Sequence, residues 1–128
     1  MKYHHLYIYI DDNIETYNKI TDLLGVKPTK FEKYKTSKEP DNKYDLWAYS
    51  VETEDEEPYF DFINKFLNIL EPKFEDLKKL GVKKNDILFW LLYEYDQQCA
   101  MEFHPEEMKR LGESGIVLNI DCWQLDKT

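Results

Sequence analysis

The stretch Ile87-Leu88-Phe89-Trp90-Leu91-Leu92-Tyr93-Glu94-Tyr95 decides the fold of this chain. Its nearly unbroken apolar and aromatic character is typical of a strand that is covered on both faces. Such a strand belongs in the middle of a sheet. The sequence therefore predicts a sheet with residues 87–95 near its centre.

Polar breaks and helix signals divide the rest of the chain. Asp96-Gln97-Gln98 separates the central stretch from 99–103, which predicts a hairpin. Asp12 followed by Glu15 resembles a capping box and predicts the start of a helix. Pro72 lacks an N–H group, so the long helix that contains it should kink or restart there. The expected elements are strands at 5–10, 46–51, 87–95, 99–103 and 116–123 and helices at 13–24, 58–80 and 105–111, the last ending at Gly112 or Gly115.

The predicted helices each carry an apolar stripe that must be buried against another surface. One face of a sheet supplies that surface. The sequence therefore predicts an α+β two-layer sandwich, in which a five-stranded mixed sheet has helices packed on one face in the order βαβαββαβ. A chain of 128 residues has the size of one domain, 1–128, and no repeat or linker divides it.

Composition restricts the classes of partner. The chain has 26 acidic and 17 basic side chains and a formal net charge of -9, so the phosphates of nucleic acid are repelled. No apolar run approaches the length of a membrane-spanning helix and no signal-peptide pattern precedes the first strand, so we expect a cytoplasmic protein without membrane contact. Cys99 and Cys122 are then expected to be reduced, buried and inert.

Four short motifs mark helix ends and one strand. They are Leu23-Leu24-Gly25-Val26-Lys27-Pro28-Thr29, Leu46-Trp47-Ala48-Tyr49-Ser50, Leu70-Glu71-Pro72-Lys73, and the run from His104-Pro105-Glu106 through Arg110-Leu111 to Gly115-Ile116. In these motifs the chain resembles, from about His5 to Gln124, the bacterial family catalogued as domain of unknown function 4279. The resemblance implies a small bacterial cytosolic α+β domain without an agreed activity. It also implies a relation to toxin-immunity proteins, because some relatives lie near toxin genes.

No constellation of residues indicates a reaction or a cofactor. His4 and His5 are neighbours on a strand and point to opposite faces, so they do not converge on a metal ion. His104 with a cysteine does not favour a thiolate, since acidic residues outnumber basic ones nearby. Asp11-Asp12 and Glu106-Glu107 have a simpler role at helix N-termini, and no glycine-rich phosphate loop is present. We therefore expect no metal, no cofactor and no enzymatic activity.

The strongest functional signal is the sheet face turned away from the helices. If Leu6, Ile8 and Leu118 face the helices, strand parity turns their neighbours to the other side. That face then combines aromatic with acidic side chains, a combination that suits a basic partner. Three alternatives stay open: a surface for another protein, a homodimer interface, or rings that loops cover as part of the core. The candidate partner-binding residues are Tyr7, Tyr9, Glu102, Asp121 and Trp123.

A second candidate lies between the first helix and the second strand. The segment 27–43 is locally basic in an acidic protein, which suggests a flap that binds an anion or a small molecule. The alternative is a solvated loop whose charge offsets that of its neighbours. The residues for anion binding are Lys30, Lys33 and Lys35.

These features favour a non-enzymatic protein-interaction domain. Acidic charge and outward aromatic rings suit an immunity protein that binds and neutralises a basic toxin. RNA stacking on the aromatic face is disfavoured, because such platforms are rimmed with basic residues and the chain has one arginine. The alternative is a small-molecule or anion-binding domain that uses segment 27–43.

Overall fold

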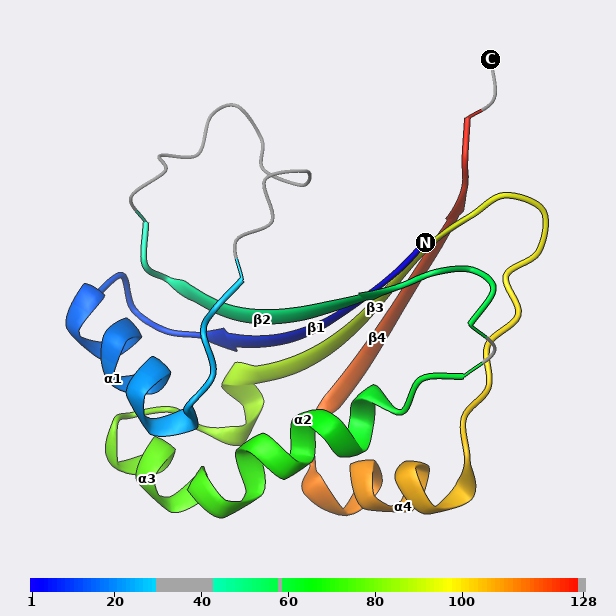
Figure 1. Ribbon diagram of the computed structural model, residues 1–128. Coiled ribbons are helices and arrows are strands. Elements are labelled where there is room, and N and C mark those ends of the chain that lie inside the picture. Colours follow the sequence, from blue (N-terminus) through cyan, green and yellow to red (C-terminus); the bar gives the residue numbers. More distant parts are fainter. Residues whose placement is uncertain (30–42, 58, 127–128) are drawn as a thin grey trace.

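The structure is a computed structural model that describes residues 1–29, 43–57 and 59–126. The described chain forms two layers, a mixed sheet and a layer of helices against one of its faces (Figure 1). This arrangement confirms the predicted α+β class. Two parts of the sequence predictions fall outside the described residues, namely Lys30, Lys33 and Lys35 of the anion-binding segment and Pro58 at the expected helix start.

The sheet has four strands in the order β2-β1-β3-β4. β1 (Lys2–Tyr9) pairs antiparallel with both β2 (Leu46–Thr53) and β3 (Ile87–Tyr95). β3 pairs parallel with β4 (Val117–Gln124). β3 therefore lies inside the sheet, as its apolar sequence predicts, and β2 and β4 form the two edges.

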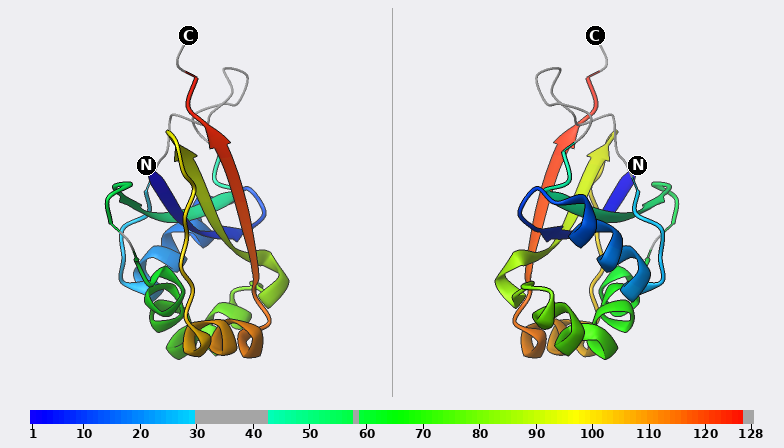
Figure 2. Two further views of the ribbon diagram at one scale, coloured as in Figure 1. Left: turned by 90° about the vertical axis from the view of Figure 1, so that its right-hand side faces the viewer. Right: turned by 90° about the vertical axis from the view of Figure 1, so that its left-hand side faces the viewer.

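The predicted fifth strand at 99–103 is wrong. Residues 96–104 instead form an irregular segment that runs from the sheet layer down to α4 (Pro105–Ser114) in the helix layer (Figure 2). Because β4 is parallel to β3, the chain needs a crossover between them and not a hairpin. The alternation that suggested a strand has another cause, since Met101 and Phe103 pack against the core while their neighbours are exposed.

α1 (Ile14–Leu24) begins within one residue of its predicted start but has a different cap. Oδ1 of Asn13 accepts two backbone N–H groups of the first turn. Asp12, the expected cap, instead accepts the backbone N–H of Tyr44 at 2.7 Å. Gly25 ends the helix in the left-handed conformation, with φ of 70°, which favours glycine.

The long second helix is interrupted at Pro72, as predicted. α2 (Phe62–Leu70) is followed by a 3₁₀ turn over Glu71–Lys73 and then by α3 (Phe74–Lys79). The missing N–H of Pro72 prevents one continuous helix. The predicted start at residue 58 is wrong, because an aspartate directly before Phe62 caps the helix there.

α4 ends at Gly115, one of the two predicted stops, where φ is 75°. A 3₁₀ turn over Lys84–Asp86 precedes β3. The order of elements is therefore β1, α1, β2, α2, α3, β3, α4, β4, which corrects the predicted order. Within the described ranges, no helix has the length and apolar character needed to cross a bilayer.

The hydrophobic core lies between the sheet and the helices. Leu6 of β1, Trp47 of β2 and Phe89 of β3 are fully buried on the helix-facing side. Phe66 of α2 packs against them, with its ring centroid 5.3 Å from that of Phe89. Side chains of β4 are less buried than those of the central strands, since the helix-facing Ile120 is 45% exposed.

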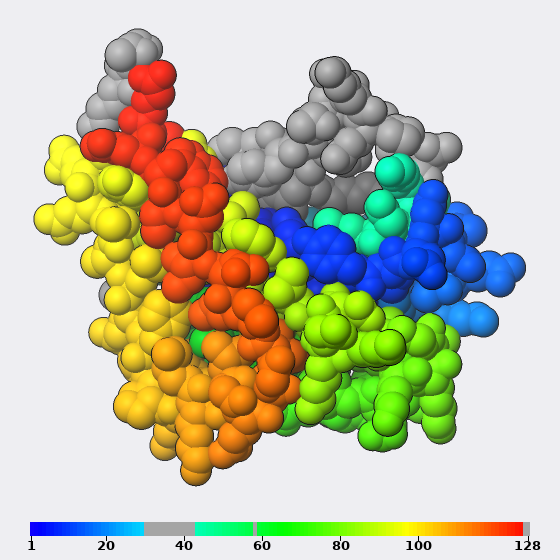
Figure 3. Space-filling view, turned by 180° about the vertical axis from the view of Figure 1, so that it is seen from behind, coloured from blue at the N-terminus to red at the C-terminus, as the bar shows by residue number. Residues whose placement is uncertain are grey.

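The two edges of the sheet differ in cover. The segment that follows α1 crosses in front of β2 (Figure 1), where the N–H of Thr29 donates to the carbonyl of Ala48 at 2.7 Å. The N–H of Ser50 donates to Oγ1 of Thr29 at 3.3 Å. β4, coloured orange to red, runs along the back of the molecule (Figure 3), and no described segment pairs with its outer edge.

Candidate interaction surface

The strand register places most of the predicted residues on the face turned away from the helices. His5 lies opposite Ser50 and Trp90, and Trp90 lies opposite Asn119, so these residues share that face. Every second residue of each strand joins them. The outward positions are Leu46, Ala48, Ser50 and Glu52 in β2, Tyr3, His5, Tyr7 and Tyr9 in β1, Leu88, Trp90, Leu92 and Glu94 in β3, and Val117, Asn119, Asp121 and Trp123 in β4.

These candidates share a face but do not lie close together on it. Asp121 lies opposite Leu92, and Leu92 lies opposite Tyr3 near the start of β1. Tyr9 is at the other end of β1, because β1 runs antiparallel to β3 and β4 runs parallel to it. The face therefore has two separate parts, which we call the tyrosine end, Tyr7 and Tyr9, and the β4 end, Asp121 and Trp123.

Burial also divides this face. Tyr3 and His5 are buried, with exposed fractions of 6% and 0%. Tyr7 and Trp123 are half-buried, and Tyr9 is 43% exposed. The outward residues of β3 are half-buried, so the predicted cover on both faces of this strand is incomplete. The start of β1 is thus buried, whereas Tyr9 at the tyrosine end and Asp121 at the β4 end are exposed.

The aromatic side chains of β1 form a continuous row. The ring of His5 stacks on that of Tyr7 at 5.1 Å, and Tyr7 meets Tyr9 edge-on at 6.3 Å. Burial raises the pKa of Tyr7 to about 12 and lowers that of His5 to about 4, so both side chains are uncharged at neutral pH. The accessible part of the row, Tyr7 and Tyr9, offers an aromatic surface with hydroxyl groups, a type of surface enriched at protein-binding hot spots.

The charge on the outward face is uniformly negative. All outward strand positions are described, and the charged residues among them are Glu52, Glu94 and Asp121. None of these positions holds a lysine or an arginine. Such a face attracts a basic partner and repels an acidic one.

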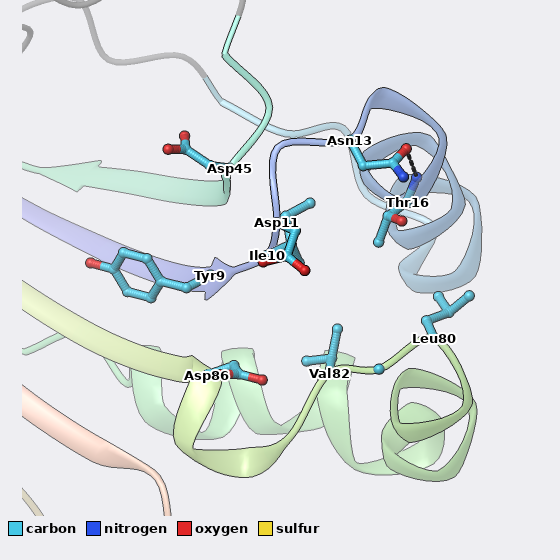
Figure 4. A pocket seen from close by; sticks show the side chains of 10 residues that line it. Tyr9, Ile10, Asp11, Asn13, Thr16, Asp45, Leu80, Val82 and Asp86 are labelled. Carbon is cyan, nitrogen blue, oxygen red and sulfur yellow. Dashed lines mark hydrogen bonds between the residues drawn. The ribbon is translucent and has the colours of Figure 1, made fainter.

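A pocket of about 480 Å³ lies beside Tyr9. It is formed by the end of β1, the start of α1 and the turn that follows α3 (Figure 4). Val82 contributes apolar surface, and none of the described residues that line the pocket is basic. Its lining includes three carboxylates, those of Asp11, Asp45 and Asp86. A pocket of this kind suits a lysine or arginine side chain, which has an apolar stem and a charged head.

Glu102 does not belong to the outward face. It lies in the irregular segment before α4, where its Oε2 is 2.7 Å from Nε2 of His104. This contact raises the pKa of His104. The sequence prediction failed for Glu102 because it assumed a strand at 99–103, and only a strand would have given this residue a sheet face.

A cluster that the sequence did not predict joins the N-termini of α2 and α4. Oε1 of the buried Glu107 accepts both the hydroxyl of Tyr59 and the backbone N–H of His104, each at 2.5 Å. The rings of Tyr59 and His104 stack at 4.1 Å. Burial and a hydrogen bond with Asp61 raise the pKa of Glu107. Burial alone raises the pKa of Asp61, but hydrogen bonds with Glu107 and Asn64 lower it below its ordinary value.

These contacts indicate a structural role for the cluster. Asp61 caps α2 and Glu107 caps α4, and the hydrogen bond between their carboxyl groups links the two helix starts. The spacing of His104 and Glu107 in the sequence suggests the capping contact, but no local pattern indicates that Asp61 and Tyr59 meet them.

The prediction that both cysteines are buried is wrong. Cys99 and Cys122 are free and exposed. Cys99 lies in the irregular segment and not in a strand. Cys122 lies on β4, whose helix-facing side the helices cover only in part.

The two N-terminal histidines point to opposite faces of β1, as predicted. His4 is buried among the rings of Phe60 and Phe62, and its Nδ1 lies 3.0 Å from the carbonyl oxygen of Val51. His5 lies on the outward face. In the part of the chain that the structure describes, no three His, Cys, Asp or Glu side chains are placed to hold a metal ion.

Comparisons with known proteins give a family and no activity. The family model described as "Domain of unknown function (DUF4279)" matches residues 1–125. No curated protein matches the chain. No solved structure matches it either.

Proposed function

The chain belongs to the DUF4279 family, and because the description of that family names no activity, we propose a function from the geometry of the surface. In this proposal the protein is a non-enzymatic interaction domain. It binds a basic protein through the tyrosine end of the outward face and the acidic pocket beside it.

One observation carries the proposal: the exposed ring of Tyr9 stands at the rim of a pocket whose described lining includes three aspartates and no basic side chain. A lysine or arginine of the partner would enter this pocket. Its stem would contact Val82, and its charge would face the carboxylates. The ring of Tyr9 would then cover the contact and exclude water, which is how aromatic residues strengthen hot spots.

The charge of the whole face supports the same class of partner. The acidic residues of the outward strands extend the negative potential well beyond the pocket. Such a field speeds the approach of a basic protein and weakens at high salt. A basic toxin whose cationic site is occupied by this face is the partner we propose, in keeping with the immunity role that the family resemblance implies.

The test uses a short oligo-arginine peptide as a probe and amide NMR shifts as the readout. We expect shifts at the end of β1 and around Asp11, and we expect Tyr9→Ala to weaken binding at least about tenfold. Asp11→Lys should weaken it further. Asp11 is exposed, so this change leaves the fold intact.

The matched control is Glu113→Lys, which changes the net charge by the same amount on the exposed side of α4. It should weaken binding much less than Asp11→Lys. Equal losses in both variants would show that the peptide responds only to net charge and would overturn the proposed site. A Tyr9→Ala protein that binds like wild type would overturn it as well.

A further inference from the structure

We propose that two copies of this chain associate through the outer edges of their β4 strands, which pair antiparallel around a two-fold axis at Ile120. This interface lies along the β4 edge of the sheet, which β3 separates from β1 and its tyrosine end. It goes beyond the proposed function and does not depend on it.

Among the described residues, the outer edge of β4 lacks the features that protect edge strands of monomers. Natural edges are kept from pairing by short length, prolines, lysines, bulges or a covering segment. β4 has 8 residues, VLNIDCWQ, and its one charged residue is Asp121. Val117 is 54% exposed and Ile120 is 45% exposed. Such an edge is expected to pair with another strand.

No described segment takes up the backbone hydrogen-bonding groups along this edge of β4. The N–H of Leu125 donates to the carbonyl of Tyr95 in β3 at 2.8 Å. In a parallel pair the residues of one strand alternate, so every second residue directs its N–H and C=O groups to the same neighbour. The residues that direct these groups to the outer edge are Leu118, Ile120, Cys122 and Gln124.

Self-pairing at this edge restricts the register. Directly opposite residues of an antiparallel pair share a face. In addition, a residue that directs its N–H and C=O groups to the outer edge must lie opposite a residue of the second copy that does the same. An axis at Ile120 meets both conditions. It places Ile120 opposite its own copy, Leu118 opposite Cys122, Asn119 opposite Asp121, and Val117 opposite Trp123.

These opposing residues are chemically compatible. Ile120 meets an identical apolar side chain, and the exposed Val117 gains contact with an indole ring. The amide of Asn119 can donate to the carboxylate of Asp121 in the second copy. Cross-strand pairs of these kinds each contribute about 0.2 to 1 kcal/mol relative to alanine pairs.

The neighbouring registers are less favourable. An axis at Asp121 places two carboxylates directly opposite each other, which destabilises the pair. An axis at Asn119 leaves Trp123 opposite Gly115, which ends α4 and lies outside the strand. Axes nearer the end of β4 pair fewer of its residues. The sequence of β4 therefore favours one self-pairing.

In the resulting dimer both β4 edges are paired. Its sheet is continuous, with four strands from each copy, and ends on both sides in β2. At each β2 edge, Thr29 already takes up the carbonyl of Ala48 and the N–H of Ser50. A two-fold axis closes on itself, so association through β4 is limited to two copies. The two outward faces lie on the same side and form a wider negative surface.

The first test measures the mass of the full chain by sedimentation equilibrium without any partner. We expect a dimer of the 15.6 kDa chain. Ile120→Lys places two like charges across the axis and should yield a monomer. The control Ile14→Lys removes an equally exposed isoleucine from α1 and should remain a dimer. A wild-type monomer, or a dimeric Ile120→Lys protein, would overturn the proposal.

A second test uses a disulfide and does not depend on how Ile120→Lys folds. Cys99→Ser and Cys122→Ser remove the exposed thiols, and Ile120→Cys then adds one thiol at the axis. Opposed residues of this kind have Cα atoms about 5.5 Å apart, within the range of a disulfide. Mild oxidation should give a covalent dimer. Gln124→Cys in the same background should stay uncrosslinked, and equal crosslinking of both variants would overturn the register.

Both tests are made without a basic probe or partner. A monomeric result would therefore not contradict the proposed binding of a basic partner at the pocket beside Tyr9. Loss of oligo-arginine binding in Tyr9→Ala would likewise say nothing about β4.

Discussion

The two edges of the sheet are protected in different ways. At β2 the chain covers its own edge, because Thr29 donates its N–H to Ala48 and accepts the N–H of Ser50 with its hydroxyl. At β4 no described segment pairs with the outer edge, and Val117 and Ile120 are exposed there. Thr29 takes up two backbone groups of β2, whereas no described residue takes up such groups along the outer edge of the 8-residue β4, so β4 is the edge that we expect to pair with another strand.

The largest effect is expected at a residue on which both edges depend. Phe89 is fully buried on β3, opposite Leu6 on the β2 side and Leu118 on the β4 side. Phe89→Ala should lower the free energy of unfolding by about 3 to 5 kcal/mol, as expected for a deleted buried ring. Urea unfolding followed by circular dichroism measures this loss.

Leu118→Ala is the matched variant on the open side. Leu118 is half-buried, so the loss should be clearly smaller than for Phe89→Ala. Equal losses would show that the core is as complete at β4 as at the centre of the sheet. That result would contradict the difference between the two edges.

The next effect is a pH dependence of the contacts between β1 and β2. Nδ1 of His4 lies 3.0 Å from the carbonyl oxygen of Val51, and Nδ1 of His5 lies 2.6 Å from Oγ of Ser50, so both histidines bond β1 to β2. Burial lowers the pKa of each from 6.5 to about 4. Their contribution to stability is complete above pH 6.5 and is lost as the pH falls toward 4. Linkage gives a loss of about 2 kcal/mol for each histidine between pH 7 and pH 5.

The measurement is the free energy of unfolding at pH 7 and pH 5 for wild type and for His4→Phe. The variant fits the aromatic surroundings of His4 and should reduce the fall by about 2 kcal/mol. His104→Gln is the control. Its contact with Glu102 raises the pKa of His104, which has the opposite sign, so this variant should retain the full fall. An unchanged fall in His4→Phe would show that His4 does not titrate as described.

A smaller effect tests the closure of the β2 edge. Thr29→Val keeps the shape of the side chain and removes the hydroxyl that accepts the N–H of Ser50. The lost hydrogen bond should cost about 1 kcal/mol. The edge would also become less protected, so species larger than the dimer should appear in sedimentation velocity at high concentration. Thr16→Val on α1 should produce neither change, and larger species in both variants would point to a different cause.

Local signals explain the parts of the fold that the sequence predicted. The apolar run of β3, the glycines after α1 and α4, and Pro72 each act within a few residues, so their effect is visible without the fold. The strand at 99–103 was wrong because alternation over five residues has two causes. Met101 and Phe103 reach the core from an irregular segment and produce the same pattern.

The candidate site shows the limit more clearly. Parity predicted that Tyr9 and Asp121 share a face, because side chains alternate in any strand. It did not predict that they lie at opposite ends, because that depends on strand order and direction, which are set by contacts distant in sequence. The pocket beside Tyr9 was missed for the same reason, since its aspartates come from three separate segments.

The smallest effect tests the register of β4 against β4. Asn119 lies opposite Asp121 of the second copy in the proposed dimer, so Asn119→Asp creates two pairs of opposed carboxylates. Each pair should cost about 0.2 to 1 kcal/mol, which weakens the dimer roughly fivefold in total.

Combining Asn119→Asp with Asp121→Asn exchanges the two residues and restores the original pair chemistry. The dimer should then regain its affinity, as measured by sedimentation equilibrium at low salt, where charge repulsion is least screened. If the axis were at Asp121 instead, Asp121→Asn alone would strengthen the dimer. Adding Asn119→Asp to that variant would then leave the affinity of the dimer unchanged, so these variants separate the two registers.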